Sequence, residues 1–291
     1  MLVAVTELTP PDATLEQLYT GTEWAEGPLW LPATRSVRWS DIPSDRILEF
    51  DAATGETRVH RDGVEFTNGR TLDLDGAVVQ CCHGRRTIER EIDGQPVTLA
   101  GAWEGGRFNS PNDIVVASDG SIWFTDPPYG ILSDREGHAA PQEYDGCYVF
   151  RFDEASGEVR PVITDMVHPN GLAFSPDESL LYVSDTNEDE HWIRVYDVVD
   201  GECRNGRLFA VISPGAPDGF RVDESGRVWT SSGDAVQVLG TDGAVVGRIP
   251  VPERVSNLCF GGDDGQDLYI TASSSLYRIR VTARQAPRPT R

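Results

Sequence analysis

The sequence contains no lysine, and all 25 of its basic residues are arginines. A Schiff-base mechanism and a Walker-type phosphate loop both need a lysine amine, so its absence excludes these two chemistries. Acidic residues are in large excess, because 47 Asp and Glu give a formal net charge of −22. This charge argues against nucleic acid and anionic membrane surfaces as partners and is typical of a well-solvated surface.

Cysteine is scarce, and its spacing suits neither disulfides nor metal. The five cysteines form an odd set without CxxC spacing: Cys81, Cys82, Cys147, Cys203 and Cys259. Neither a disulfide framework nor a zinc ribbon is therefore expected. A GxSxG elbow is also absent, which argues against a serine nucleophile of that kind.

Long apolar runs and helical periodicity are missing as well. No apolar run approaches the length of a membrane span. The first 17 residues lack the basic region and long apolar core of a signal peptide. Only Leu15–Tyr19 is compatible with a short helical turn. We expect a cytoplasmic protein without a membrane segment, whose oligomeric state the sequence leaves open.

One short phrase occurs six times. The copies are WAEGP, FTNGR, SPNDI, HPNGL, APDGF and VSNLC. Aligned, they place six residues in one structural position: Glu26, Asn68, Asn112, Asn170, Asp218 and Asn257. The successive spacings are 42, 44, 58, 48 and 39 residues. A period in the forties with short apolar runs is typical of a β-propeller.

The residues after each phrase predict a strand, a turn and a second strand. In the third copy, strands are expected over Asn112–Val116 and Ser121–Thr125. In the fourth copy, they are expected over Gly171–Phe174 and Leu180–Ser184. Six such units predict an all-β fold, a six-bladed β-propeller.

The chain length favours one domain, which we place at residues 1–281. The N-terminal segment Leu2–Leu18 is predicted to add a strand to the last blade and so to close the ring, which removes a sheet edge. Residues 282–291 are polar and contain proline, and we predict a disordered tail there.

The phrase residues are candidate metal ligands if each phrase opens the innermost strand of its blade. Asn-Gly and Asp-Gly pairs are also common turn signals, so a single copy favours a turn. The set points to a ligand ring, because all six positions carry an oxygen donor and none is Cys or His. Two carboxylates with several amides favour one hard divalent ion, Ca²⁺ first, although Zn²⁺, Mn²⁺ and Fe²⁺ also tolerate oxygen-rich sites.

Other polar residues follow the second strand of several units. His83, Asp126 and Asp185 occupy such positions. These side chains either line a pocket or cap the blade turns through local hydrogen bonds, and the sequence leaves both open. The long connection over residues 127–146 is either a rim or lid over the channel mouth or a mobile surface loop.

Five stretches carry a family resemblance. They are EGPLW at Glu26, SPND at Asn112, FTDPPYG at Phe124, HPNGLAFSPDE at His168 and PDGFRVDESGRVW at Pro217. Their order and spacing, from about Thr22 to Val281, resemble the senescence marker protein/gluconolactonase family. The resemblance implies a six-bladed propeller with one catalytic divalent metal on its axis and hydrolysis of sugar-type lactones.

Matched motif by motif, the resemblance implies Glu26, Asn170 and Asp218 as metal ligands. It implies Asn112 as a fourth position that contacts metal or substrate, and Asp218 as the general base. Position alone suggests four further substrate contacts: His83, Asn109, Tyr129 and Asn187.

The chain departs from the family pattern at Ser110. Animal members carry an arginine there, two residues before the equivalent of Asn112. The change leaves the implied metal ligands in place and puts the substrate in question, with Arg107 and Asn109 as nearby replacements.

The sequence thus predicts a metal-dependent lactonase that opens a sugar-type lactone such as gluconolactone, with the metal as Lewis acid. An organophosphatase or arylesterase on the same frame is one alternative. A non-enzymatic binding propeller is another, and it would present an apolar patch. Two carboxylates in the ring argue against it, because without a cation they would repel each other.

Overall fold

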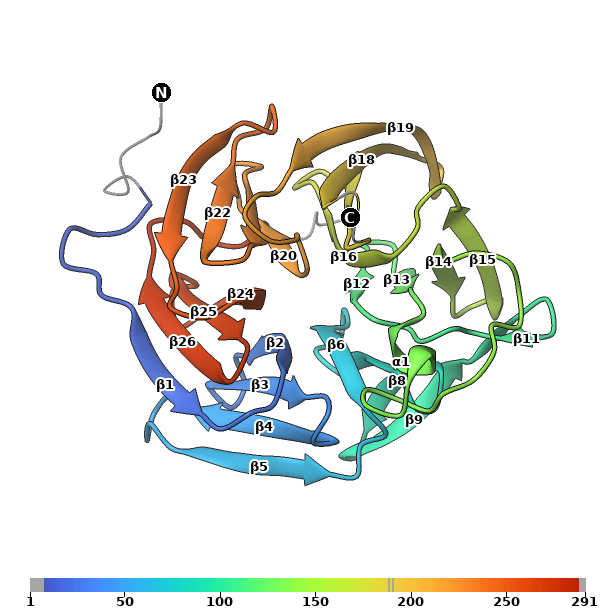
Figure 1. Cartoon of the computed structure of the whole chain (residues 1–291), viewed down its shortest axis with the longest axis horizontal. Coiled ribbons are helices and arrows are strands. Elements are labelled where there is room, and N and C mark those ends of the chain that lie inside the picture. The colour runs from blue at the N-terminus through green and yellow to red at the C-terminus, as the bar shows by residue number, and fades with distance from the viewer. Residues whose placement is uncertain (1–7, 188, 190, 288–291) are drawn as a thin grey trace.

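The computed structural model describes residues 8–187, 189 and 191–287. Six antiparallel four-stranded sheets stand around a common axis (Figure 1). The predicted six-bladed β-propeller is confirmed. Within the described residues, no helix is long and apolar enough to cross a membrane.

Each blade runs from an inner strand at the axis to an outer strand at the rim. Blade one contains β2 (Ala25–Leu31), β3 (Ser36–Asp41), β4 (Arg46–Asp51) and β5 (Thr57–Asp62). Blade two contains β6 (Thr67–Leu72), β7 (Val78–Cys82), β8 (Thr87–Ile92) and β9 (Gln95–Ala100). Blade three contains β12 (Ile114–Val116), β13 (Ile122–Asp126), β14 (Tyr148–Asp153) and β15 (Glu158–Ile163).

The second half of the ring repeats this order. Blade four contains β16 (Pro169–Phe174), β17 (Leu180–Asp185), β18 (Trp192–Val199) and β19 (Glu202–Val211). Blade five contains β20 (Phe220–Val222), β21 (Val228–Ser231), β22 (Ala235–Leu239) and β23 (Val245–Pro250). Blade six contains β24 (Val255–Gly261), β25 (Asp267–Ala272), β26 (Ser275–Arg280) and β1 (Glu16–Thr20).

Two small additions lie between blades two and three and within blade three. The strands β10 (Ala102–Trp103) and β11 (Gly106–Arg107) form a separate hairpin. The short helix α1 (Tyr129–Leu132) lies in the long connection between β13 and β14.

The ring is joined where the two ends of the described chain meet. β1 pairs antiparallel with β26, with Glu16 opposite Arg278 and Thr20 opposite Ser275. The short helical turn suggested for Leu15–Tyr19 is therefore wrong, because most of that segment forms a strand. Residues 1–7 of the predicted closing segment lie outside the described residues.

The first residues of the predicted tail pack onto the propeller. Thr282 donates its N–H to Leu8 O at 2.9 Å, and Ala286 donates to Val222 O at 3.0 Å. Ala283 is buried, and Gln285 forms an isolated bridge with Asp223 of blade five. Residues 288–291 lie outside the described part of the chain.

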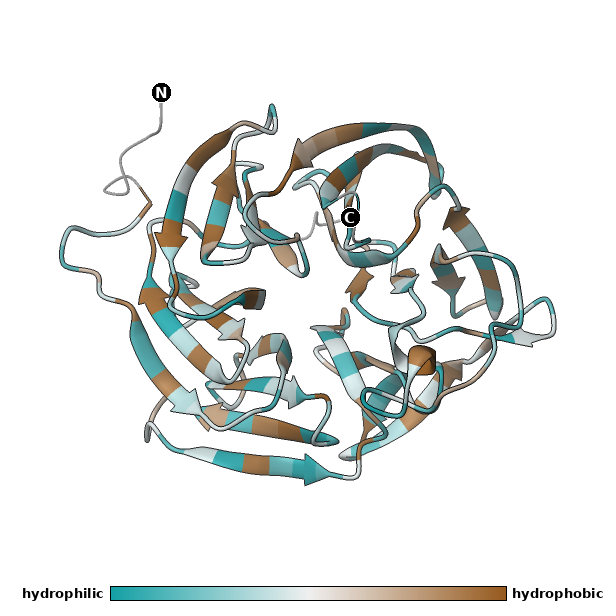
Figure 2. Ribbon diagram, viewed as in Figure 1, coloured by the Kyte–Doolittle hydropathy of each residue, from teal (hydrophilic) through white to brown (hydrophobic). Residues whose placement is uncertain are grey.

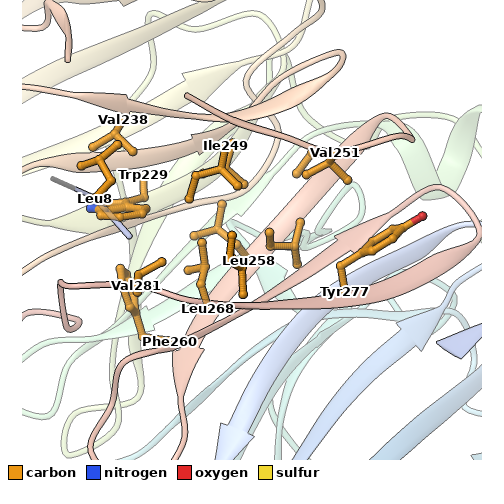
Figure 3. Packing of buried hydrophobic residues seen from close by; sticks show 14 of the residues in the cluster. Leu8, Trp229, Val238, Ile249, Val251, Leu258, Phe260, Leu268, Tyr277 and Val281 are labelled. Atoms are coloured by element: carbon orange, nitrogen blue, oxygen red, sulfur yellow. The ribbon is translucent and has the colours of Figure 1, made fainter. Parts of the chain in front are cut away.

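The core lies between the faces of neighbouring blades. Apolar and polar residues alternate in the second half of β26, the third strand of blade six (Figure 2), where buried Ile279 lies between the partly exposed Arg278 and Arg280. Figure 3 shows the layer between blades five and six, where Trp229 of β21 packs with Leu258 of β24 and Leu268 of β25. Burying each such side chain contributes about 1.5–3 kcal/mol and fixes the blades against one another.

Candidate functional site

The six phrase residues all lie at the start of an inner strand. Four of them lie within β2, β6, β16 and β24, and the other two lie two residues before β12 and β20. Because the inner strands surround the axis, the repeat brings the phrase residues together from all six blades (Figure 1).

The glycine after the phrase residue allows neighbouring inner strands to approach closely. A Cβ on Gly171 would lie 2.4 Å from Asp218 O, and a Cβ on Gly69 would lie 2.5 Å from Asn112 O. The same glycines donate their N–H groups to these carbonyls, at 3.1 and 2.8 Å. In these copies the glycine marks a contact between blades, and the tight turn that the pair suggested is not formed there.

Hydroxyl groups on the second strand of a blade fix the phrase residue of the next blade. Thr125 Oγ1 of β13 donates to Asn170 O at 2.6 Å, and Ser184 Oγ of β17 donates to Asp218 O at 2.8 Å. The main chains of Asn170 and Asp218 are therefore held by the preceding blade, which restricts where their side chains can point.

Buried aspartates at the end of the second strand hold the segment before the phrase. Asp41, Asp126 and Asp185 end β3, β13 and β17. Each accepts hydrogen bonds from two consecutive main-chain N–H groups. Asp41 accepts from Glu23 and Trp24, Asp126 from Asn109 and Ser110, and Asp185 from Val167 and His168. Asp126 and Asp185 therefore cap loops, which decides between the two roles left open by the sequence.

A cavity of about 300 Å³ opens among the phrase residues. Its lining consists of Trp24, Glu26, Ile42, Asn68, Asn112, Tyr129, Arg135, Glu136, Asn170, Thr186, Asp218 and Arg254. Six residues singled out from the sequence as site residues meet here: Glu26, Asn68, Asn112, Tyr129, Asn170 and Asp218. Tyr129, Arg135 and Glu136 come from the 127–146 connection, which therefore forms part of the rim.

Glu26 is buried with only one of its carboxylate oxygens bonded. Its Oε2 accepts hydrogen bonds from Gly27 N at 2.5 Å and from Asn257 Nδ2 at 3.0 Å. Its Oε1 is buried and has no hydrogen-bond partner among the described residues. Burial, and then the negative charge of Asp218, raise the pKa of Glu26 well above its ordinary value.

His83 orients the amide of Asn68. Its Nδ1 lies 2.9 Å from Glu136 O, which can only accept, so Nδ1 carries the proton. Nε2 then accepts from Asn68 Nδ2 at 3.3 Å, and Asn68 Oδ1 stays buried without a partner in the described chain. Burial lowers the pKa of His83 to about 4, so the ring is neutral near pH 7.

Asn170 is oriented in a similar way, by Thr186 of its own blade and, through Thr186, by Tyr129 of blade three. Its Nδ2 donates to Thr186 Oγ1 at 3.3 Å, and Thr186 is in turn hydrogen-bonded to Tyr129. This leaves the amide oxygen of Asn170 available to a ligand in the cavity.

Asp218 has a fixed main chain, and its carboxylate lines the cavity. Its N–H donates to Ser231 Oγ at 2.7 Å, while its carbonyl accepts from Gly171 and Ser184. Burial raises the pKa of Asp218 to about 7, and the charges of Asp113 and Glu136 add to the rise. The positive charge of Arg254 and a hydrogen bond from Asn170 oppose it.

The donor set fits a hard divalent cation. The two carboxylates of Glu26 and Asp218 repel each other, and two buried oxygens, Glu26 Oε1 and Asn68 Oδ1, have no hydrogen-bond partner among the residues that the structure describes. Within the described residues no group of three His, Cys, Asp or Glu could hold a metal, so amide oxygens must complete the site. Amide and carboxylate oxygens together are typical of Ca²⁺.

Asn257 completes the repeat without offering a free oxygen. Its Oδ1 accepts from Leu258 N at 2.8 Å, and its Nδ2 donates to Glu26. It therefore positions Glu26, and the six repeated positions divide into possible ligands and residues that support them.

Three residues proposed as substrate contacts lie outside the cavity lining. Asn109 is buried, and its Nδ2 donates to Asp126 O and Gly146 O at 3.2 and 3.1 Å. His83 is buried behind Asn68. Asn187 follows the Asp185 cap and donates its N–H to Asp185 Oδ1 at 3.0 Å. None of the three is among the described residues that line the cavity.

Ser110 fastens the rim. Its Oγ donates to Pro127 O at 2.6 Å and accepts from Gly130 N at 2.9 Å. The side chain is fully buried, so an arginine would displace the start of the rim. Arg107 lies outside the cavity lining and donates to Arg85 O at 3.1 Å.

Sequence reasoning missed two residues at the mouth, Trp24 and Arg254. Trp24 is the first residue of the WAEGP copy, two residues before Glu26, and Arg254 directly precedes the VSNLC copy, three residues before Asn257. The repeat marks the aligned oxygen donor in each copy, whereas the residues that flank it share no side-chain type that would have pointed to these two.

Comparison with known proteins matches residues 24–274 to the SMP-30/Gluconolactonase/LRE-like region. The chain belongs to this family. A gluconolactonase from Zymomonas mobilis subsp. mobilis is 29% identical over 305 residues, covering 96% of this chain and 84% of the relative. The pentonolactonase XacC of Haloferax volcanii is 30% identical over 262 residues, covering 87% and 83%.

Solved structures of related proteins superpose over nearly the whole chain. A gluconolactonase from Xanthomonas campestris has a TM-score of 0.91 and 40% identity, covering 97% of this chain and 93% of that one. A calcium-binding protein, regucalcin from Agrobacterium tumefaciens, shares the fold with a TM-score of 0.76 at 20% identity, covering 94% and 96%. The SMP-30/gluconolactonase resemblance seen in the sequence is thus confirmed.

Proposed function

We propose that this chain is a metal-dependent lactonase that hydrolyses a sugar-type lactone to its hydroxy acid. The observation that carries the proposal is the buried Glu26 Oε1, which has no hydrogen-bond partner among the described residues and lies in a cavity shared with Asn112, Asn170 and Asp218. The gluconolactonase and pentonolactonase relatives support a lactone as the substrate. The calcium-binding regucalcin with the same fold supports a divalent ion, Ca²⁺ first.

Glu26, Asn170 and Asp218 would hold the ion, and Asn112 would offer a fourth oxygen. A divalent ion bound there supplies positive charge that polarises a lactone carbonyl. The main-chain hydrogen bonds to Asp218 and the Thr186 contact to Asn170 fix these donors before substrate arrives.

Asp218 is proposed as the general base. Its carboxylate takes a proton from water as the water oxygen bonds to the carbonyl carbon. The ester C–O bond then breaks, and the proton passes to the ring oxygen that leaves as an alcohol. The rim residues Tyr129 and Glu136 line the same cavity and would take up space next to the bound lactone.

The direct test is hydrolysis of D-glucono-1,5-lactone and of a pentonolactone by chelator-treated protein, with Ca²⁺, Zn²⁺, Mn²⁺ and Fe²⁺ restored one at a time. The rate is followed as acid release, and spontaneous hydrolysis is subtracted. We expect activity to return with one or more ions. Full activity without any ion would contradict the metal dependence. Turnover of a phosphotriester but of no lactone would favour an organophosphatase instead.

Two aspartate variants separate the role of Asp218 from general effects of charge. Asp218→Ala should lose both metal affinity and rate, whereas near-native turnover would rule out its role as base. Asp234→Ala is the matched control, because Asp234 lies in the same blade, is paired with Arg248 and is outside the cavity lining.

A further inference from the structure

We infer that Arg254 selects lactones that carry an anionic group remote from the reacting carbonyl, such as lactones of sugar diacids. The inference rests on the proposed lactonase function, since it names the substrate class of the same cavity.

Arg254 presents an unused guanidinium at the cavity mouth. The residue is exposed and lines the cavity. Its guanidinium has no hydrogen-bond or ion-pair partner in the part of the chain that the structure describes. It lies over the ring of Trp24, 5.5 Å from the ring centroid. A cation on an indole keeps its N–H donors free for a ligand, because the ring uses only its face.

The second arginine of the cavity is already neutralised. Arg135 forms ion pairs with Glu136 at 2.8 Å and with Glu23 at 3.1 Å. Its donors are therefore shared with protein carboxylates, and Arg254 is the cavity arginine that a substrate anion can approach without first breaking an ion pair.

The Trp24 ring beneath Arg254 is held in place by the buried carboxylate of Asp41 in blade one. Asp41 Oδ1 accepts the N–H of Trp24 at 3.2 Å, and Arg46 holds the other carboxylate oxygen at 2.9 Å. The carbonyl of Arg254 accepts from Ser273 N at 3.0 Å. Trp24 and Arg254 precede the inner strands of adjacent blades, so the blade contact itself places the guanidinium.

Charge balance in the cavity favours a monoanion. Among the residues that line the cavity, the two negative charges of Glu26 and Asp218 match one divalent ion. Glu136 is matched by Arg135, whose other ion-pair partner, Glu23, lies outside the lining. Arg254 then carries the one positive charge that is not matched within the lining. A carboxylate meets the planar guanidinium with two parallel hydrogen bonds, which a neutral hydroxymethyl group cannot form.

The test uses two lactones that differ at one carbon. D-glucono-1,4-lactone and D-glucaro-1,4-lactone have the same ring, and only the second carries a carboxylate at C6. We expect the kcat/KM ratio of glucaro- to gluconolactone to fall about tenfold in Arg254→Met, because a charged hydrogen-bonded pair is lost. The change in the ratio should lie mainly in the KM of the glucarolactone. The ratio is the readout because the charge of Arg254 also acts on Asp218, so its loss affects the hydrolysis of both lactones.

Arg254→Lys and Arg248→Met serve as controls. Lysine keeps the charge without the planar fork and should retain part of the preference. Arg248 is an arginine paired with Asp234 outside the cavity lining, and its replacement should leave the ratio unchanged. High salt should reduce the wild-type preference, because it screens an exposed charge.

Calorimetry of the metal-loaded protein measures the binding affinities for D-glucarate and D-gluconate, so it tests the same preference without turnover. Preferential binding of glucarate that Arg254→Met abolishes supports the inference, even if neither lactone is hydrolysed and the proposed lactonase function fails. An unchanged ratio in both turnover and binding overturns the inference, and lactone hydrolysis would then still support the lactonase.

Discussion

Replacing Asp218 by asparagine should stabilise the metal-free protein although it removes a residue central to the proposed reaction. The Asp218 carboxylate lies in a cavity with Glu26, and the charges of Asp113 and Glu136 act on it as well. Without a cation, ionised Asp218 is unfavourable in the folded state. Asparagine has nearly the same shape and carries no charge, so this cost disappears.

The magnitude follows from the pKa of Asp218. Its rise from 3.8 to about 7 corresponds to ~4 kcal/mol, since one pKa unit is worth ~1.4 kcal/mol. The cost is complete above the folded-state pKa of about 7 and is lost as the pH falls toward 3.8. At pH 8 the variant should gain up to ~4 kcal/mol, or roughly 8 °C in Tm, and at pH 5 less than half of that.

The assay is thermal and denaturant unfolding in excess chelator at pH 5 and pH 8. Asp264→Asn is the control of opposite sign, because the Arg280 hydrogen bond lowers the pKa of Asp264 to about 2. That variant loses a favourable charge and should not gain stability. Added divalent ion should then raise the Tm of the wild type more than that of Asp218→Asn.

The reasoning is refuted if Asp218→Asn is no more stable than the wild type at pH 8 in chelator. It is also refuted if the gain is larger at pH 5 than at pH 8, because the linkage requires the opposite order.

Three further substitutions test how the site is supported. Gly171→Ala places a Cβ 2.4 Å from Asp218 O. We expect the free energy of unfolding in denaturant to fall by about 2 kcal/mol and the metal affinity measured by calorimetry to fall as well. Wild-type values for both would contradict the role of Gly171 in the close approach of the strands. His83→Leu frees the Asn68 amide and should raise the metal Kd or the KM about tenfold, with kcat less affected; unchanged binding would make the contact purely structural. Ser110→Arg should lower the Tm by several degrees, because the buried position holds the rim, and a stable variant with altered lactone preference would show that arginine fits there.

The repeat allowed much of the fold to be predicted. Strands expected over Gly171–Phe174 and Leu180–Ser184 are observed as β16 and β17 with shifts of at most two residues. The repeat can be recognised because each blade needs the same local pattern, a polar residue at the axis followed by a pair of apolar strands. A pattern of this kind lies in consecutive residues, so it can be read from the sequence without the fold.

The composition of the cavity was only partly visible. Asn170 and Asp218 share a position in the repeat, so their convergence could be expected. Trp24 and Arg254 are 230 residues apart and lie together because β1 and β26 join the ends of the chain. Ring closure could be predicted from the sequence, but the side chains that it brings into contact could not, because no local pattern relates residues so far apart.

The sequence by itself determined the number of blades, the oxygen donors around the axis and the family resemblance, because these properties repeat at regular spacing. Tertiary structure decided what each donor does. Asn68 and Asn257 occupy equivalent positions, yet His83 leaves the oxygen of Asn68 unpartnered, while Leu258 N occupies that of Asn257. The difference arises from neighbours in the folded chain, since an amide is available to a ligand only when the surrounding strands leave its oxygen without a hydrogen bond.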